Sequence, residues 1–247
     1  MSVAEPKGRA IVVGASSGIG AALVRRLVAE GWRTAALARR ADKLDELSRD
    51  CQGEVLVRAH DVTATAEVPG LFEELVRELG GLDLLVYAAG IMPEVAPDEF
   101  DTEKDLAILA VNTGGCMAWC NPAAELFQSQ RRGTIVGLSS IAGDRGRRGN
   151  PAYCTSKAAM NTYLEALRNR LGVFGVNVCT IRPGFVDTDM TKGMPGLFWL
   201  ISPDQAAQTI LKAARKKRGV RYVPFRWLFV GLAIRSIPSL LFRRLNI

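Results

Sequence analysis

Seven short apolar runs recur along the chain, and the segments between them have the length and polarity of helices. The runs are RAIVV, RTAALA, EVLVRA, LDLLVYA, GTIVGLS, VNVCTI and RYVPF, each bounded by glycine, aspartate or proline. Continuous apolar strands that alternate with helices are typical of a parallel sheet covered on both faces. Right-handed crossovers then predict one α/β domain over residues 1–247, a Rossmann-like, doubly wound sheet of about seven strands. The expected helices span 18–30, 42–51, 66–79, 102–130, 151–171 and 203–217.

The first apolar run leads into the sequence GASSGIG, with glycines at 14, 18 and 20, and a helix is expected to begin near Ile19. A glycine-rich turn between a strand and a helix lets backbone N–H groups and the helix dipole meet a pyrophosphate without interference from Cβ atoms. The turn therefore predicts a dinucleotide site, although three glycines alone also suit a simple tight turn.

The end of the second apolar run indicates which dinucleotide binds. Arg39 and Arg40 follow Ala38, at the place where an acidic residue would bind the ribose 2′-hydroxyl of NAD. Arginine instead suits the 2′-phosphate of NADP, and the alternative is a pair of solvated loop arginines. Asp61, in HDVT after the third run, is either a partner for the adenine amino group or a turn cap.

The region that follows the fifth run contains three residues whose spacing suits proton transfer. Ser140 lies at a strand end, Tyr153 follows thirteen residues later, and Lys157 is four residues further along. An i, i+4 spacing places the phenol and the ammonium on one helix face, where we expect the lysine to lower the pKa of the tyrosine. Such a tyrosine exchanges a proton with a carbonyl or an alcohol near neutral pH, while a serine hydroxyl polarises the same oxygen. A tyrosine and a lysine four residues apart occur together by chance, so the pair taken alone does not predict a catalytic site.

The glycine turn, Asp61, Ala89-Gly90, Asn112, Ser140, Tyr153, Lys157 and the sequence RPGFVDT at 182–188 occur in one order along the chain. Together they resemble the short-chain dehydrogenase/reductase family over residues 9 to about 220. The chain departs from the family pattern at Val13, where threonine is usual, and in YAAG at 87–90, where NNAG is usual.

The resemblance implies a role for each matching residue. Tyr153 would be the general acid in the reducing direction, and Ser140 would orient and stabilise the substrate oxygen. Lys157 would tune Tyr153 and hold the nicotinamide ribose, and Asn112 would anchor a water that links Lys157 to solvent. Residues implied to contact the cofactor are Gly14, Ser16, Ser17, Gly18, Ile19, Gly20, Arg39, Arg40, Asp61, Val62, Ala88, Ala89, Gly90, Tyr153, Lys157, Pro183, Gly184, Val186 and Thr188. No metal site is expected.

The NADP(H) assignment indicates the direction of the reaction. Because cells keep NADPH reduced, we expect an NADPH-dependent carbonyl reductase that transfers a hydride to a ketone. The competing enzymes are a 3-oxoacyl reductase of fatty-acid synthesis and a reductase of a steroid or another lipid ketone. A non-catalytic NADP-binding scaffold is disfavoured, because Ser140, Tyr153 and Lys157 are all present.

The segment after Thr188 is the expected source of substrate selectivity, since it follows the carboxyl end of a strand. Its sequence, DMTKGMPGLFWLISP, is apolar and contains two glycines that allow movement. We expect residues 188–202 to form a lid over an apolar substrate. The alternative is a surface helix docked on its own domain or on a partner subunit.

Two stretches carry a narrower resemblance. The sequences AGDRGRRGNPAY and YVPFRW…IRSIPSLLFRRL are similar to those of reductases that act on the 2-keto intermediate of a polyprenyl-phosphate-linked pentofuranose. The resemblance implies a lipid-linked ketone substrate. Arg145, Arg147 and Arg148 would then face a lipid phosphate, and solvated loop arginines are the alternative.

The net charge of +7 is unevenly distributed. Ten basic residues and no acidic residue follow Gln205, which leaves 22 basic against 25 acidic residues in 1–204. The basic residues lie among long apolar side chains, which suits an anionic membrane surface better than nucleic acid. Residues 227–242 would form a helix of about 24 Å, too short for roughly 30 Å of hydrocarbon. We therefore expect residues 225–247, the C-terminal extension, to lie in the headgroup layer or to be buried in an oligomer.

The remaining features concern location and assembly. Five cysteines, an odd number with a lone His60, are typical of reduced apolar residues in a cytosolic protein. The sequence MSVAEPKGRAIVVG does not have the pattern of a signal peptide. A cytoplasmic location is expected, with membrane contact at the inner face. The family resemblance implies a homodimer or homotetramer formed through the helices at 102–130 and 151–171.

Overall fold

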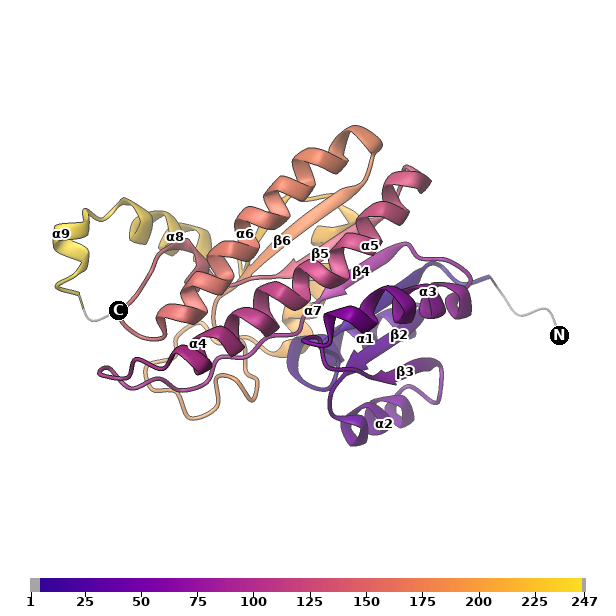
Figure 1. Cartoon of the computed structure of the whole chain (residues 1–247), viewed down its shortest axis with the longest axis horizontal. Helices are drawn as coiled ribbons and strands as arrows, with labels where there is room; N and C mark the ends of the chain where they lie inside the picture. Colours follow the sequence, from indigo (N-terminus) through magenta and orange to yellow (C-terminus); the bar gives the residue numbers. More distant parts are fainter. Residues whose placement is uncertain (1–4, 246–247) are drawn as a thin grey trace.

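Seven parallel strands form one sheet in the order β3-β2-β1-β4-β5-β6-β7, as the apolar runs predict (Figure 1). The structure is a computed structural model, and it describes residues 5–245. Residues 1–4 of the segment examined for a signal peptide, and residues 246–247 of the C-terminal extension, lie outside the described residues. The strands are β1 (Arg9–Val13), β2 (Arg33–Ala38), β3 (Val55–Ala59), β4 (Leu84–Tyr87), β5 (Thr134–Leu138), β6 (Asn177–Pro183) and β7 (Val220–Val223).

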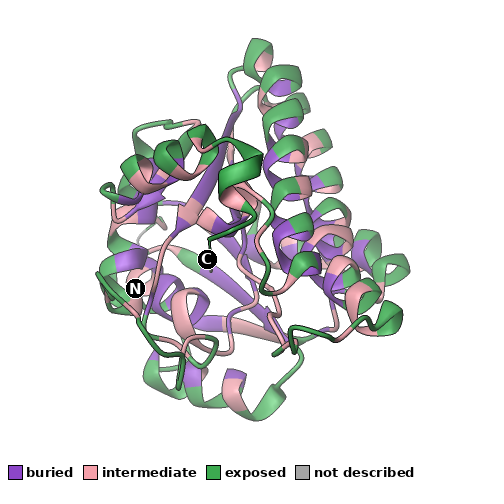
Figure 2. Ribbon diagram, turned by 90° about the vertical axis from the view of Figure 1, so that its left-hand side faces the viewer, coloured by how far each residue is buried: buried purple, intermediate pink, exposed green. Residues whose placement is uncertain are grey.

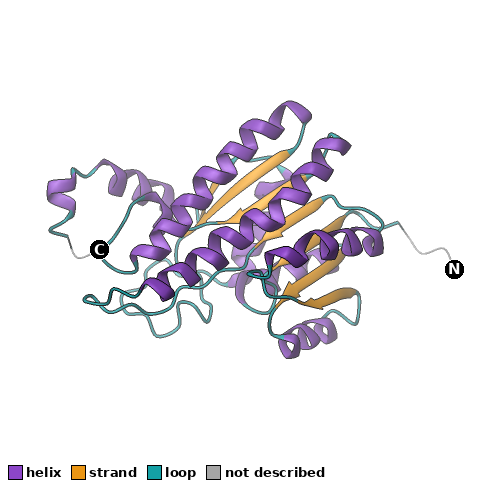
Figure 3. Ribbon diagram, in the orientation of Figure 1, coloured by secondary structure: helices purple, strands orange, loops and turns teal. Residues whose placement is uncertain are grey.

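Helices cover both faces of this sheet (Figure 3). One face carries α1 (Gly18–Ala29), α2 (Ala41–Asp50) and α7 (Pro203–Arg215), and the other carries α3 (Val68–Leu79), α5 (Gly115–Gln130) and α6 (Pro151–Leu171). The short helix α4 (Thr102–Leu109) precedes α5, and 3-10 turns lie at Thr65–Glu67, Ile141–Asp144 and Gly172–Phe174.

The side chains of each strand alternate between two cores. In β1, Ala10 and Val12 pack beneath α1 and α7, whereas Ile11 and Val13 pack beneath α3 and α5. All four are fully buried, because a parallel sheet with helices on both faces leaves neither face to water. Figure 2 shows buried residues along the strands and on the inward sides of the helices.

The strand order places a crevice above β1 and β4. The chain runs outward from β1 to β2 and β3, then returns to β4 on the other side of β1. Ligands bind at such a reversal, beyond the carboxyl ends of the strands. Gly14 follows β1 and Ala88 follows β4, so both lie at this edge of the sheet.

The helix expected over 102–130 is present as one helical segment, and a π-helical turn, Ala110–Gly114, lies inside it between α4 and α5. Asn112 lies in this turn with its side chain buried and bonded to another segment of the chain. A π turn adds one residue to a helical ladder and often marks a functional position. The insertion rotates Asn112 out of the register that an uninterrupted helix would impose.

The C-terminal extension forms two short helices, α8 (Trp227–Ser236) and α9 (Ser239–Phe242). They project at the end of the molecule opposite the N-terminal segment (Figure 1). Pro238 lies between them, and proline removes the N–H donor that a continuous helix would need. Within residues 5–245, no helix combines the length and the apolar character needed to cross a bilayer.

Candidate active site

The glycine turn after β1 is shaped by close backbone contacts. Gly14 has a φ of +90°, and a Cβ at this position would lie 2.3 Å from the amide nitrogen of Ala89. A Cβ on Gly20 would lie 2.1 Å from the carbonyl oxygen of Gly14. Only glycine therefore lets α1 begin this close to the turn and to the segment after β4. The result is an open helix N-terminus, which is suited to bind a pyrophosphate.

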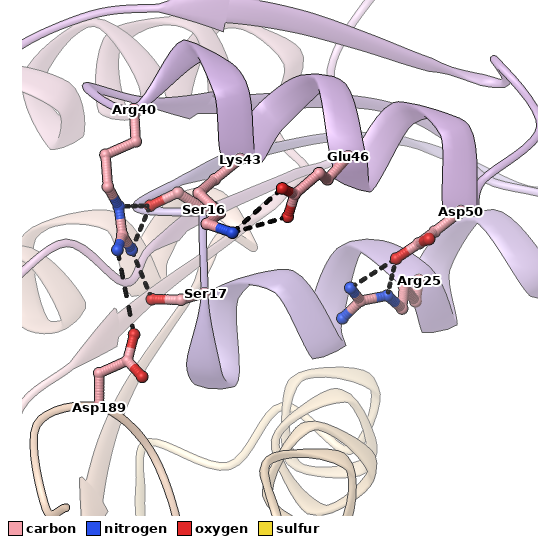
Figure 4. Close-up of polar contacts among 8 residues, drawn as sticks. All are labelled: Ser16, Ser17, Arg25, Arg40, Lys43, Glu46, Asp50 and Asp189. Carbon is pink, nitrogen blue, oxygen red and sulfur yellow. Dashed lines mark hydrogen bonds and ion pairs between the residues drawn. The ribbon is translucent and has the colours of Figure 1, made fainter.

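Arg40 connects the end of β2 to the glycine turn (Figure 4). Its Nη2 donates to the hydroxyls of Ser16 at 2.9 Å and Ser17 at 2.7 Å. Its Nη1 lies 3.9 Å from a carboxylate oxygen of Asp189, at the start of the expected lid. The guanidinium thus lies between the glycine turn and the lid, where it adds positive charge to the site.

Arg39 points toward Asp61 at the end of β3. The Nη1 of Arg39 lies 3.8 Å from a carboxylate oxygen of Asp61, and both side chains are largely exposed. Asp61 accepts hydrogen bonds from the backbone N–H of Thr63 at 2.9 Å and from its hydroxyl at 2.8 Å. The Thr63 N–H is the largest of the contributions that lower the pKa of Asp61. Asp61 therefore caps a turn in the structure, which is one of its two expected roles. The other role, contact of Asp61 with the adenine amino group, stays a prediction.

These residues surround a cavity of about 640 Å³. Its lining contains most of the residues expected to bind the cofactor, namely Gly14, Ser16, Ser17, Gly18, Ile19, Gly20, Arg39, Arg40, Val62, Ala88, Ala89, Gly90 and Thr188. The expected cofactor residues that do not line it are Asp61, Tyr153, Lys157, Pro183, Gly184 and Val186. A Cβ on Gly184 would lie 2.0 Å from the indole of Trp227, so this side of the strand end is covered by the C-terminal extension.

Asn112 is held behind the cavity by the segment after β4. Its Oδ1 accepts from the backbone N–H of Ile91 at 2.8 Å, and its Nδ2 donates to the carbonyl of Ile91 at 3.0 Å. The same Nδ2 lies 2.9 Å from the Ser156 hydroxyl of α6. Asn112 therefore connects the π turn, the cavity wall and the helix that carries the tyrosine and the lysine.

Lys157 is buried against the end of β5. Its Nζ donates to the carbonyl of Leu138 at 2.9 Å, and a Cβ on Gly90 would lie 3.4 Å from Nζ. Leu138 and Gly90 both line the cavity, so Lys157 lies directly behind its wall. Burial disfavours the charged ammonium and lowers the pKa of Lys157 to about 8.

Tyr153 is fixed by the start of α6. Asn150 caps the helix by accepting from the Tyr153 N–H at 3.0 Å, and Pro151 occupies the first turn. The ammonium of Lys157 lies 5.7 Å from the centroid of the Tyr153 ring. The helix spacing thus brings these two residues together, as expected.

The expected lowering of the Tyr153 pKa by Lys157 is wrong. Burial raises the pKa of Tyr153, and this effect exceeds the lowering by a hydrogen bond with Ser140 and by the charge of Arg147. Tyr153 is only 7% exposed, so desolvation of the phenolate dominates. Ser140, whose hydroxyl also accepts from the Ala142 N–H at 3.1 Å, lies on the same side of the site.

The three arginines before α6 have different surroundings. Arg145 donates to the backbone carbonyls of Ile234, at 2.8 Å, and Ile237. Arg148 donates to the backbone carbonyl of Arg243 at 2.7 Å. Both guanidinium groups therefore hold the C-terminal extension. Arg147 has a buried Nε without a hydrogen-bond partner in the described chain, and its charge lowers the pKa of Tyr153.

Sequence reasoning missed a buried polar cluster beside the site. Arg182 donates to Asp144 at 2.7 Å and to the Tyr222 hydroxyl at 2.9 Å, and Tyr222 donates to Asp144 at 2.8 Å. A Cβ on Gly231 would lie 2.5 Å from Asp144, so α8 packs directly on this cluster. The only signal in the sequence is Arg182 of RPGFVDT, and nothing there identifies its two distant partners.

The expected lid is an irregular loop with joined ends. Val186 and Ile201 form a β-bridge, and the Asp187 N–H donates to the Ile201 carbonyl at 2.9 Å. No regular helix forms in it, so the surface-helix alternative for 188–202 is wrong. Phe198 stacks on Trp227 with ring centroids 5.0 Å apart, which joins the loop to the C-terminal extension.

The apolar part of the cavity lining also escaped sequence reasoning. Ile91, Met92, Val111 and Leu138 line the cavity, together with Met190 of the loop. Apolar residues at strand ends and helix turns have no distinctive spacing, so only the fold brings them together.

Comparison with known proteins agrees with this geometry. Residues 9–195 match the family model described as short chain dehydrogenase. A 3-oxoacyl-[acyl-carrier-protein] reductase of Bos taurus is 34% identical over 183 residues, which cover 74% of this chain and 77% of that protein. An uncharacterised oxidoreductase of Mycobacterium tuberculosis is 27% identical over 241 residues, 95% of each chain.

The fold has close counterparts among solved structures. A short-chain type dehydrogenase/reductase from Mycobacterium ulcerans superposes with a TM-score of 0.82 at 23% identity, covering 89% of each chain. With the family model matched over most of the chain, the protein is an oxidoreductase acting on CH–OH and C=O groups, and it belongs to the short-chain dehydrogenase/reductase family.

Proposed function

We propose that this protein is an NADPH-dependent reductase of a ketone in an apolar, lipid-linked substrate. The observation that carries the proposal is the position of Lys157 and Asn112 directly behind the cavity wall formed by Gly90 and Leu138. Tyr153 belongs to the buried cluster that packs against Ile91 and Met92 of the same cavity lining. The residues of this wall would hold part of a dinucleotide cofactor, whose chemistry is hydride transfer.

NADPH, when bound, supplies the hydride that adds to the carbonyl carbon. Tyr153 donates its phenolic proton to the carbonyl oxygen, so that hydride and proton together convert the ketone to an alcohol. Burial raises the pKa of Tyr153, so the phenol carries its proton at neutral pH and can donate it in the reducing direction. Ser140 donates a hydrogen bond to the same oxygen and stabilises its developing charge.

Lys157 and Asn112 return a proton to Tyr153 after each turnover. With its pKa lowered to about 8, the Lys157 ammonium exchanges protons readily near neutral pH. Asn112 lies at the Ile91 segment, which lines the cavity, so it is placed to hold a water between Lys157 and solvent. Tyr153, Ser140 and Asn112 would thus take the roles that the family resemblance implies, and Lys157 would act in proton return rather than by lowering the pKa of Tyr153.

The NADP(H) assignment is supported by two cations at the cavity. Arg39 and Arg40 both line it, and Arg40 already donates to the hydroxyls of Ser16 and Ser17. A 2′-phosphate would give these guanidinium groups a doubly charged partner. Asp61, the nearest carboxylate to Arg39, is held by Thr63 and lies outside the cavity lining.

Binding measurements with the two cofactors test this assignment. We expect NADPH to bind more tightly than NADH, and Arg39→Ala and Arg40→Ala each to weaken NADPH binding by about 10- to 100-fold, the loss of one charge-assisted contact. NADH binding should change little. Arg25→Ala is a matched control, since Arg25 of α1 pairs with Asp50 of α2 and neither residue lines the cavity (Figure 4). Equal affinity for both cofactors, unchanged in the variants, would contradict the assignment.

An apolar, lipid-linked substrate is supported by the surroundings of the cavity. The loop at 188–202 exposes Met194, Phe198 and Trp199 at 41–48% of their surfaces, and Met190 lines the cavity. Among the described residues, the buried Nε of Arg147 has no hydrogen-bond partner, and the charge of Arg147 lowers the pKa of Tyr153. An apolar entrance with one available cation suits a polyprenyl-phosphate-linked keto-sugar, the substrate class of the narrower resemblance.

A 3-oxoacyl reductase is the second candidate. The 34% identity to the Bos taurus 3-oxoacyl-[acyl-carrier-protein] reductase favours it. That match covers 74% of this chain, and the family model ends at residue 195, before the C-terminal extension. A reductase of a steroid or other lipid ketone would use the apolar loop equally well.

Oxidation of NADPH with three ketones separates these candidates. The panel is an acetoacetyl thioester, a steroid ketone and a polyprenyl-phosphate keto-pentofuranose. We expect the highest kcat/KM with the lipid-linked sugar, and loss of activity in Tyr153→Phe with NADPH binding retained. Arg147→Gln should raise KM for the phosphate-bearing substrate more than for the steroid. Activity with the thioester alone would refute the lipid-sugar proposal.

A further inference from the structure

We propose that the C-terminal extension docks on an anionic membrane surface beside the entrance of the active site. The proposal concerns where the enzyme works and does not depend on which ketone it reduces. It rests on the side chains that α8 and α9 turn outward, on their charge, and on their contact with the loop at 188–202.

The helix α8 buries one side and exposes apolar residues on the other. Trp227 and Gly231, four residues apart, face the body of the protein, against Gly184 and Asp144 respectively. Phe229 and Leu232 are 62% and 51% exposed. In α9, Leu240 and Leu241 are 64% and 55% exposed, and no residue is buried. Helices that are fixed to the domain therefore expose large apolar side chains to solvent.

The C-terminal extension carries only positive charge. Arg226, Arg235, Arg243 and Arg244 are exposed on the extension, and no acidic residue follows Asp204 anywhere in the sequence. Arginines placed among exposed leucine and phenylalanine match the two components of an anionic bilayer surface, its headgroup charge and its acyl boundary. A symmetric contact between two copies would instead bring like charges together.

The extension and the loop at 188–202 form one continuous surface. Phe198 stacks on Trp227. Trp199 lies edge-on to Trp227, with the ring centroids of these two residues 5.8 Å apart. The guanidinium of Arg226 lies 4.7 Å above the Trp199 ring. Because this loop begins at the cavity with Thr188, a membrane bound to the extension would also lie next to the cavity entrance. A ketone anchored in the bilayer could then enter without its lipid chain crossing water.

The arginines before α6 keep this surface in a fixed position. Arg145 and Arg148 donate to backbone carbonyls of the extension, and the Arg145 guanidinium also lies 4.0 Å from the Phe242 ring centroid. The docking surface is therefore tied to the segment that leads into Tyr153. Rigid presentation lowers the entropy cost of binding.

Sedimentation of the full-length protein with vesicles tests the proposal. The vesicles contain either phosphatidylcholine alone or phosphatidylcholine with phosphatidylglycerol. We expect binding to the anionic vesicles only, and weaker binding as the salt concentration rises. Arg243→Gln/Arg244→Gln should weaken binding about thirtyfold at low salt, at about 1 kcal/mol for each cation near the surface. Phe229→Ser/Leu232→Ser should weaken it by about thirtyfold or more, through lost apolar insertion.

Matched controls separate these effects from general changes in charge or hydrophobicity. Lys216→Gln/Lys217→Gln removes two exposed cations at the opposite end of β7, and Val173→Ser removes a 75%-exposed apolar residue after α6. Both controls should bind the vesicles as the unmodified protein does. NADPH binding, measured on every variant, reports whether the fold is retained.

Three results would overturn the proposal. The first is equal binding to neutral and anionic vesicles, and the second is equal loss in the control variants. The third is a combination of two observations. The unmodified protein does not bind vesicles, and Phe229→Ser/Leu232→Ser changes the oligomeric state, measured by size-exclusion chromatography with light scattering. That result would assign the surface to contact between copies of the chain.

Discussion

Arg145 is expected to hold the end of the C-terminal extension, and its replacement by methionine tests this directly. Its Nη1 donates to the carbonyls of Ile234 and Ile237, and its Nη2 donates to the Ser239 hydroxyl at 3.2 Å. The carbonyls lie at the end of α8, where the helix itself provides no donors. Arg145→Met keeps most of the apolar stem and removes all three bonds and the cation–π contact with Phe242.

The cost follows from these contacts. Hydrogen bonds to a charged donor contribute about 1.5–3 kcal/mol when one partner is removed, and a partly exposed cation–π contact adds about 0.5–1 kcal/mol. Because Arg145 is half-buried, we take the lower end and expect about 2–3 kcal/mol of local stability to be lost. Opening of α9 would then become about 30- to 150-fold more frequent.

Amide hydrogen exchange measures this opening. The N–H groups of Leu241 and Phe242 donate to Pro238, and that of Arg243 donates to Ser239. Their protection should fall by the stated factor in Arg145→Met, while the global unfolding transition changes little because α9 buries no residue. Arg132→Met, at an exposed position before β5, is the control. Unchanged exchange at 241–243 would refute the holding role.

Two further substitutions test the interior of the site. Lys157 has a pKa lowered to about 8 when folded, against 10.5 for an ordinary lysine. Between these values the unfolded chain binds more protons, so the free energy of unfolding should rise with pH, by about 3 kcal/mol in total. Urea unfolding at several pH values should show this rise, and Lys157→Met should lack it; equal slopes would contradict the burial argument. Gly184→Ala forces a Cβ within 2.0 Å of Trp227 and should cost about 1–3 kcal/mol. In a double-mutant cycle with Trp227→Ala the two losses should not add; full additivity would show that the clash is absent.

The strands and the glycine turn were predictable because their determinants are local. Fully buried strands require continuous apolar runs, and a backbone that approaches Ala89 as closely as Gly14 does permits no side chain. The i, i+4 spacing of Tyr153 and Lys157 likewise needs only a helix to bring them together. For these features the pattern in the sequence is also the physical cause.

Other features depend on partners that are distant in the sequence. The π turn at Asn112 is fixed by hydrogen bonds with Ile91, 21 residues away. The Arg182 cluster joins Asp144 and Tyr222, which are 78 residues apart. The pKa of Tyr153 depends on how completely the fold buries it, and burial outweighed the effect expected from spacing. No local pattern carries this information.

The three arginines of RGRR illustrate how the fold divides residues that look equivalent in the sequence. The sequence left two interpretations for all three, contact with a lipid phosphate or exposure to solvent, whereas Arg145 and Arg148 donate to backbone carbonyls of the C-terminal extension. Arg147 differs from them, because its buried Nε has no hydrogen-bond partner among the described residues and its charge lowers the pKa of Tyr153. Arginines of one short loop therefore have different surroundings, and only Arg145 and Arg148 hold the extension. Since that loop runs from Ser140 to Tyr153, a shift of the extension on a membrane would act directly on the segment that positions the proton donor.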